Sequence, residues 1–163
     1  PIAEQIERLN AVQAAGKTRF IGVSNQNIAQ MRESIARSAA PIVTNQVELH
    51  PYLSQHALVA AARDAGAAVT AYYGMADGAV PRDETLQRIS AKYGKSAAQV
   101  GLRWLIQQGH IALSKTANPA RLAENTAVFD FVLDEADMAA IAALTRADGR
   151  LVSPAGLAPT WDA

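Results

Sequence analysis

The sequence predicts an α/β protein with parallel strands, and three observations support this prediction. Segments with apolar residues at helical spacing alternate with short β-branched segments along the chain. This alternation pairs strands in parallel through right-handed crossovers. Alanine makes up 35 of the 163 residues and aromatic residues only 6%, which favours helices over an all-β fold. The expected order is one helix, four β-α units, of which the third has two consecutive helices, and a final helix.

The first half of the chain should hold three helices and three strands. The helices are expected to end before Gly16, Pro41 and Gly66, which are typical stop signals. Asn25 or Asn27 can cap the second helix, and Ser54 the third. The strands are expected at residues 19–24, 42–48 and 67–73, which are rich in β-branched and apolar residues.

The second half of the chain adds four helices and one short strand. Asp83, Asn118 and Asp134 are expected N-caps, and Ser96 with Gln99 three residues later forms a capping box. These helices should cover residues 84–93, 97–108, 119–126 and 135–144, with a strand at 111–114 between the second and third. Residues 146–163 are expected to form a C-terminal tail at the surface.

The pattern alone leaves two sheet architectures open. A closed (β/α)8 barrel takes eight strands and about 250 residues. Four β-α units could instead form an open, doubly wound sheet. The glycine-rich dinucleotide fingerprint is absent, because Gly22-Val23-Ser24 lacks its further glycines. The chain begins at Pro1 in a helical pattern, so we expect it to be part of a longer protein.

Composition excludes several classes of function. The 15 basic and 15 acidic residues balance, which argues against nucleic-acid or anionic-membrane binding. Without cysteine the chain can form no disulfide or thiolate metal site. The three histidines, His50, His56 and His110, lack metal-ligand spacing, and no apolar run is long enough to span a membrane. A cytoplasmic protein without a metal is therefore expected.

Five segments of the chain match one known family in order and spacing. They are GKTRFIGVSN (16–25), NQVELHPY (45–52), VTAY (69–72), YGKSAAQV with LRW (93–104), and SKT with the residues that follow (114–131). Together they resemble strands five to eight of the aldo-keto reductases. The resemblance implies an α/β (β/α)8 TIM barrel, of which this chain is the second half. Its partner would be the missing N-terminal half, within a full-length monomer.

The resemblance also implies a site for the nicotinamide of NADPH. Ser24, Asn25 and Gln46 match residues that hydrogen-bond the carboxamide, whose donors and acceptors Asn and Gln can satisfy. Tyr72 matches the aromatic residue that stacks on the nicotinamide ring. The alternatives from the residues alone are that Ser24 and Asn25 cap the next helix and that Tyr72 is a core residue.

A second group of residues matches the adenosine end of the cofactor. Lys115, Thr116 and Arg121 match the 2′-phosphate site, where Arg can bind phosphate through two hydrogen bonds. Glu124 and Asn125 match adenine contacts. The alternative from the residues alone is that Lys115 and Arg121 are ordinary surface cations and that Glu124 is a surface carboxylate. The loop at residues 73–76 departs from the family pattern, which puts its pyrophosphate contacts in doubt.

The implied activity is NADPH-dependent reduction of a small carbonyl substrate to an alcohol. The family's catalytic Asp, Tyr, Lys and His match no position here, so this chain alone should be inactive. One alternative is a non-catalytic NADPH-binding or scaffold protein, and another is a half-barrel that pairs with a second copy.

Several prominent residues are expected to have other roles. Glu48 and His50 are interpreted as structural, Trp104 and Phe129 as core, and Trp161 as a candidate substrate contact.

Overall fold

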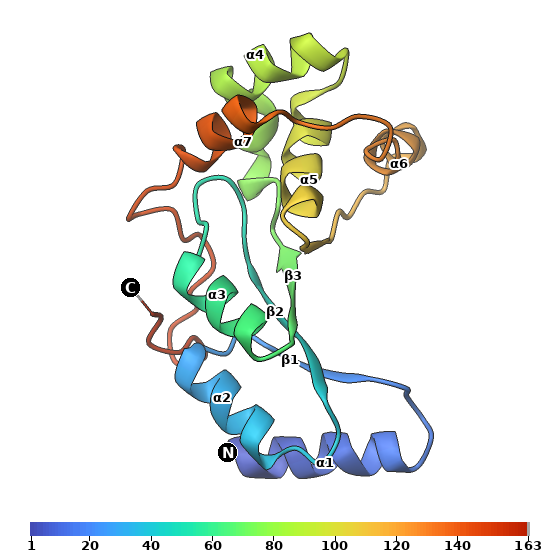
Figure 1. The fold of residues 1–163 in the computed structure, drawn as a ribbon, viewed down its shortest axis with the longest axis vertical. Coiled ribbons are helices and arrows are strands. Elements are labelled where there is room, and N and C mark those ends of the chain that lie inside the picture. The colour runs from blue at the N-terminus through green and yellow to red at the C-terminus, as the bar shows by residue number, and fades with distance from the viewer. Residues whose placement is uncertain (163) are drawn as a thin grey trace. The chain divides into compact units, whose positions relative to one another are not determined.

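The computed structural model describes residues 1–162, and its elements alternate as predicted (Figure 1). The helices are α1 (Ile2–Ala14), α2 (Ile28–Arg37), α3 (His56–Asp64), α4 (Glu84–Tyr93), α5 (Ala97–Gln107), α6 (Pro119–Thr126) and α7 (Glu135–Ala142). The strands are β1 (Ile21–Ser24), β2 (Ile42–Glu48), β3 (Ala68–Tyr72) and β4 (Ile111–Ala112), with short 3₁₀ helices η1 (Ala76–Gly78) and η2 (Val80–Arg82). The strand order in the sheet is β1-β2-β3-β4, and β1 pairs with β2 in parallel. The α/β class with a parallel sheet is therefore confirmed.

Contacts divide the chain into two compact units. The first contains Pro1–Val47, Gln55–Thr70 and the segment that begins at Ser153, and the second contains Glu48–Ser54 and Ala71–Val152. The first unit therefore holds α1, α2 and α3, and the second holds α4 to α7.

The first unit is built around an aliphatic cluster between helix and sheet. Ile6 of α1 is buried with Ile21 of β1 and Ile42 of β2, and each such side chain contributes about 1.5–3 kcal/mol when fully buried. Ile21 also lies opposite Ile42 in the parallel register. Glycine is needed at position 22, because a Cβ there would lie 2.6 Å from the Thr44 Cγ2 atom. The two strands can approach closely only because Gly22 has no side chain.

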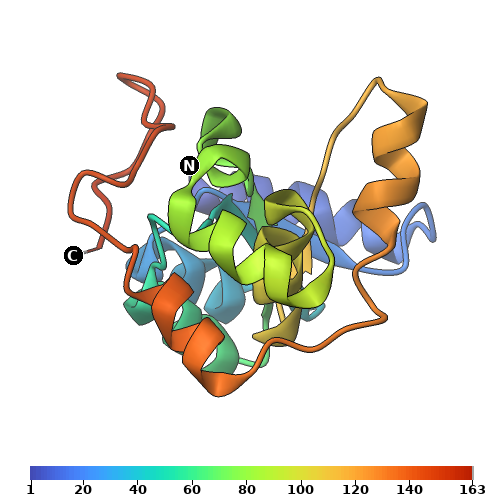
Figure 2. The same cartoon turned by 90° about the horizontal axis from the view of Figure 1, so that it is seen from above.

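The second unit is mainly helical and holds α4 to α7. Helix α4 packs against both α5 and α7, whereas α6 stands to one side of α5, away from α7 (Figure 1 and Figure 2). Trp104 of α5 is buried, as predicted. The prediction for Phe129 is wrong, because its side chain is 72% exposed. Phe129 follows α6, which buries none of its own residues.

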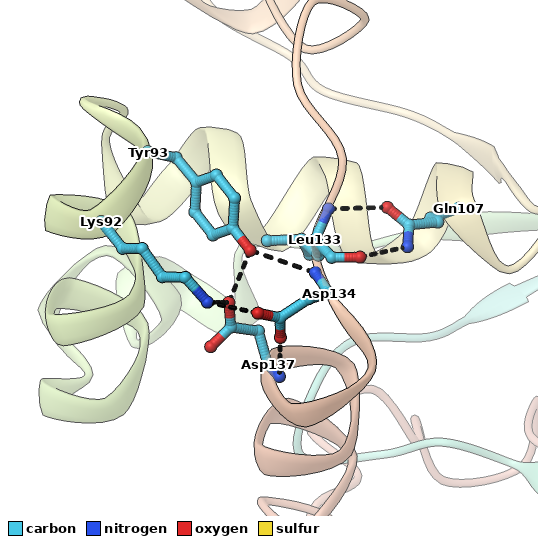
Figure 3. A network of polar contacts seen from close by, with 6 residues as sticks. All are labelled: Lys92, Tyr93, Gln107, Leu133, Asp134 and Asp137. Atoms are coloured by element: carbon cyan, nitrogen blue, oxygen red, sulfur yellow. Dashed lines mark hydrogen bonds and ion pairs between the residues drawn. The ribbon is translucent and has the colours of Figure 1, made fainter.

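A polar network ties the start of α7 to α4 and α5 (Figure 3). The Lys92 ammonium contacts the carboxylates of Asp134 and Asp137, and the Tyr93 hydroxyl donates to Asp137 at 2.6 Å. Hydrogen bonding to Asp134 and Asp137 raises the pKa of Lys92, and the Lys92 contact lowers the pKa of Asp134. The side-chain amide of Gln107 also donates to the Leu133 carbonyl at 2.7 Å. Both helices therefore fix where α7 begins.

Most of the predicted helix caps are confirmed. Asp83, Ser96, Asn118 and Asp134 accept hydrogen bonds from the first turns of their helices, and Ser96 forms the predicted capping box with Gln99. Asn27 caps α2 and also forms a capping box, with Gln30.

Two local predictions are wrong. Ser54 is not the N-cap of α3, because Gln55 occupies that position with φ of 44° and makes no side-chain cap. Strand β4 spans two residues, Ile111–Ala112, instead of the expected four, although the Leu113 N–H still donates to the Ala71 carbonyl at 3.0 Å.

The described residues contain no helix long and apolar enough to cross a membrane. Within the same residues, no group of three His, Asp or Glu side chains comes together in a way that could hold a metal ion.

Candidate functional site

A cavity of about 390 Å³ in the second unit gathers the predicted adenosine-end residues. Lys115, Thr116, Arg121, Glu124 and Asn125 all line it. Its remaining lining is Met75, Gly78, Pro81, Arg82, Ser96, Ala97, Ala98 and Ser114. The cavity is thus lined by the segments after β3 and after β4 and by residues of α5 and α6.

The segment after β4 is shaped by a local turn and a helix cap. The Thr116 hydroxyl accepts from the Asn118 N–H at 3.0 Å, and the Asn118 side chain accepts from the Ala120 N–H at 3.0 Å. Pro119 occupies the first position of α6, where the fixed φ of proline fits the helix. This geometry places Arg121 in the first turn of α6, on the wall of the cavity.

Polar contacts hold α6 beside α5. The Ser96 hydroxyl donates to the Glu124 carboxylate, and the Gln99 amide donates to the carbonyls of Glu124 and Ala127 at 3.1 and 2.9 Å. Lys95 binds both carboxylate oxygens of Asp130, which lowers the pKa of Asp130. Because α6 buries no side chain, these contacts are what position Arg121.

The predicted carboxamide-binding residues come together in the first unit. Ser24 lies opposite Gln46 in the β1–β2 register. The Ser24 hydroxyl and the Asn25 main-chain N–H both donate to the Gln46 carbonyl, at 3.0 and 2.9 Å. Asn25 adopts φ of 53°. Neither Ser24 nor Asn25 caps α2, because Asn27 does, so the capping alternative is wrong.

Tyr72 and Trp161 lie outside the cavity described above. Tyr72 is half-buried at the end of β3, and its carbonyl accepts from the Leu49 N–H at 3.2 Å. Trp161 is half-buried in the first unit. Ring stacking by Tyr72 and substrate contact by Trp161 stay predictions.

Glu48 and His50 form a buried pair at the end of β2. Both side chains are fully buried, and the His50 Nε2 atom lies 3.0 Å from the Glu48 carboxylate. Burial alone would raise the pKa of Glu48, but hydrogen bonds from His50 and from the N–H groups of Leu151 and Val152 outweigh it and lower the pKa. The pair thus anchors residues 151–152, which agrees with the structural interpretation.

Sequence reasoning missed two residues that line the cavity. The sequence predicts Ser96 as a helix cap and as part of the YGKSAAQV segment, but its hydroxyl also holds Glu124. Arg82 was not singled out at all. The sequence signal that could have identified Arg82 is its position as a basic residue at the end of the glycine-containing loop 74–82.

Comparison with known proteins places the chain in a family. Residues 1–146 match the model of the Aldo/keto reductase family. The chain belongs to this family. Methylglyoxal reductase DkgB of Escherichia coli O157:H7 is 40% identical over 162 residues, which cover 99% of this chain and 60% of that protein.

Solved structures of related proteins agree with this assignment. A candidate 2,5-diketo-D-gluconic acid reductase B is 55% identical with a TM-score of 0.98, covering all of this chain and 58% of that one. A mutant of Gox0644 in complex with NADPH is 36% identical with a TM-score of 0.89, covering 93% of this chain and 56% of that one. The chain therefore spans about three fifths of the length of these three relatives.

Proposed function

We propose that this chain is the cofactor-binding part of an NADPH-dependent aldo-keto reductase that reduces an aldehyde or ketone to an alcohol. One observation is the main support: five residues that the resemblance assigns to the adenosine end of NADPH line one cavity. The chain would form the second half of a (β/α)8 barrel, with residues 146–163 as its tail. The relatives are long enough to hold such a barrel, since this chain covers 60% of the first.

The chemistry of the cavity fits a phosphorylated nucleotide. Lys115 and Arg121 would bind the 2′-phosphate with help from the Thr116 hydroxyl, and the N-terminus of α6 adds a positive dipole end. Glu124 and Asn125 would contact adenine. One oxygen of Glu124 already accepts from Ser96, so its second oxygen would meet the base.

The residues of the first unit would orient the nicotinamide. The Ser24 hydroxyl donates to Gln46, so it retains its acceptor capacity for the carboxamide N–H₂ group. Asn25 and the Gln46 side chain would complete that contact, and Tyr72 would stack on the ring. When bound, the nicotinamide supplies the hydride for carbonyl reduction.

The remaining parts of the activity are assigned to the rest of the protein. No residue of this chain is proposed as the proton donor, so we expect the 163 residues alone to be inactive. The complete protein is proposed to act as a monomer on a small carbonyl compound in the cytoplasm. Methylglyoxal and diketo sugar acids are the first substrates to test, because the names of two relatives contain them.

Turnover by the complete protein tests this proposal. NADPH oxidation should follow addition of at least one carbonyl compound from a panel that includes methylglyoxal. If no member of a broad panel of aldehydes and ketones is reduced, the reductase proposal is wrong.

Arg121→Ala tests the 2′-phosphate assignment. The variant should weaken NADPH binding roughly tenfold or more, because a charged hydrogen-bond partner of the phosphate is lost. NADH has no 2′-phosphate, so its affinity should change much less. Arg88→Ala, at an exposed position of α4 outside the cavity, is the matched control. Equal losses for the two cofactors would contradict the assignment.

A further inference from the structure

Arg150 is a largely buried cation to which the proposed function gives no role. Its side chain is only 16% exposed, and its Nη1 atom lies 3.9 Å from the Glu48 carboxylate. Burial lowers the pKa of the Arg150 guanidinium, and electrostatic interactions with Glu48 and Tyr72 oppose that shift. Because arginine does not lose its proton in proteins, a full positive charge is held here within electrostatic reach of the Tyr72 phenol.

Glu48, Tyr72 and Arg150 gather at the carboxyl ends of two neighbouring strands. Glu48 ends β2 and Tyr72 ends β3, and the adjacent Leu49 N–H donates to the Tyr72 carbonyl at 3.2 Å. Arg150 comes from the C-terminal part of the chain, and all four residues belong to the second unit. Ligands of α/β proteins bind at the carboxyl ends of parallel strands. The charge of Arg150 therefore lies at the edge of the sheet where a ligand is expected.

Glu48 does not neutralise Arg150 completely, because its carboxylate has other donors. One oxygen accepts from the His50 ring at 3.0 Å and from the Leu151 N–H at 2.8 Å, and the other accepts from the Val152 N–H at 2.9 Å. One negative charge is thus shared among three hydrogen-bond donors and the guanidinium. The balance leaves a positive potential around Arg150.

We propose that Arg150 determines which redox state of the cofactor the site prefers, favouring NADPH over NADP⁺. This inference rests on the proposed function, in which Tyr72 stacks on the nicotinamide ring. The oxidised ring carries a positive charge, whereas the reduced ring is uncharged. Arg150 therefore repels the oxidised ring and leaves the binding of the reduced ring almost unchanged. Such a charge assists the release of NADP⁺ after each reduction.

Equilibrium titrations of the complete protein with NADPH and with NADP⁺ test this assignment. In Arg150→Met, the ratio of the Kd for NADP⁺ to the Kd for NADPH should fall about threefold to tenfold, because the charge is lost and an unbranched stem is kept. Arg150→Lys retains the charge and should hold the ratio within about twofold of wild type. The affinity for 2′-AMP, which has no nicotinamide, should not change. Arg88→Met is the matched surface control.

Glu48→Gln provides an independent test with the opposite sign. Loss of the carboxylate charge leaves Arg150 without its ion-pair partner, so the same ratio of Kd values should rise. A loss of stability by itself weakens the binding of both cofactor forms together and leaves their ratio unchanged. The opposite signs of the two variants therefore separate an electrostatic role from a merely structural one.

Three results would overturn the inference and leave the proposed function intact. They are equal losses of affinity for NADPH and NADP⁺ in Arg150→Met, a ratio that moves in the same direction in Arg150→Met and Glu48→Gln, and a ratio in Arg150→Met equal to that of Arg88→Met. If the wild-type protein binds neither NADPH nor NADP⁺, the proposed function itself is wrong, and the inference fails with it.

Discussion

At the scale of single residues, Glu48 connects the end of β2 to the C-terminal segment. Its two carboxylate oxygens accept from the Leu151 and Val152 N–H groups at 2.8 and 2.9 Å. The same segment lies close to Tyr52, since a Cβ at Gly149 would be only 1.8 Å from the Tyr52 carbonyl oxygen. A buried carboxylate is stable here because its charge is matched by donors on several sides.

Replacing Glu48 with Gln should destabilise the protein by about 2–4 kcal/mol at pH 7. The amide would place an N–H₂ group against a main-chain N–H that now donates to a carboxylate oxygen. Denaturant unfolding would measure the loss, and the Leu151 and Val152 amides should exchange their hydrogens faster. An unchanged midpoint would contradict the anchoring role.

The effect of this variant should also depend on pH. The folded-state pKa of Glu48 lies below its ordinary value of 4.5, so its stabilisation is complete above that pH. The stabilisation is lost as the pH falls through the lower, folded-state pKa. The difference between wild type and Glu48→Gln should therefore stay constant above about pH 5 and shrink in acid. A difference that grows in acid would show that Glu48 is protonated when folded.

At the scale of elements, α6 depends on α5 for its position. Ser96 has two roles, because it caps α5 and its hydroxyl contacts Glu124 of α6. The apolar side chain of Leu122 on α6 is 60% exposed, so packing contributes little to holding the helix. The placement of Arg121 at the cavity is thus decided by hydrogen bonds that originate on another helix.

Ser96→Ala should reduce both stability and cofactor affinity. Loss of the cap costs about 1 kcal/mol in unfolding free energy. Loss of the Glu124 contact should loosen α6 and weaken NADPH binding several-fold. Ser96→Thr retains a hydroxyl that can cap α5 and contact Glu124, so this variant is the control. Reduced stability with unchanged NADPH affinity would show that α6 is positioned by other contacts.

At the scale of the whole molecule, residues predicted to bind the cofactor are found in both compact units. Ser24, Asn25 and Gln46 belong to the first unit, whereas Tyr72 and the cavity at Arg121 belong to the second. A sheet of four strands also leaves β1 and β4 at its two edges. Because half of the proposed barrel is absent from it, the isolated chain should bind NADPH only weakly and should not turn over a carbonyl substrate. Calorimetry on the 163-residue chain that gives submicromolar affinity, or NADPH oxidation by it, would contradict this expectation.

The α/β class, the order of the elements and most of the helix caps can be predicted from the amino-acid sequence. These features depend on local signals, such as the Ser96–Gln99 capping box or the glycine at position 94, that act within a few residues. The family resemblance likewise pointed to Lys115, Thr116 and Arg121, which lie close together in the chain.

Features that depend on partners far apart in the sequence are visible only in the folded chain. Phe129 is exposed although its neighbour Val128 is buried, and Glu48 is an anchor because residues 151–152 reach it from about a hundred positions away. The loop after β3 brings Arg82 to the cavity that Arg121 lines from α6. The periodicity of the sequence cannot predict such contacts, because they arise from how separate elements pack.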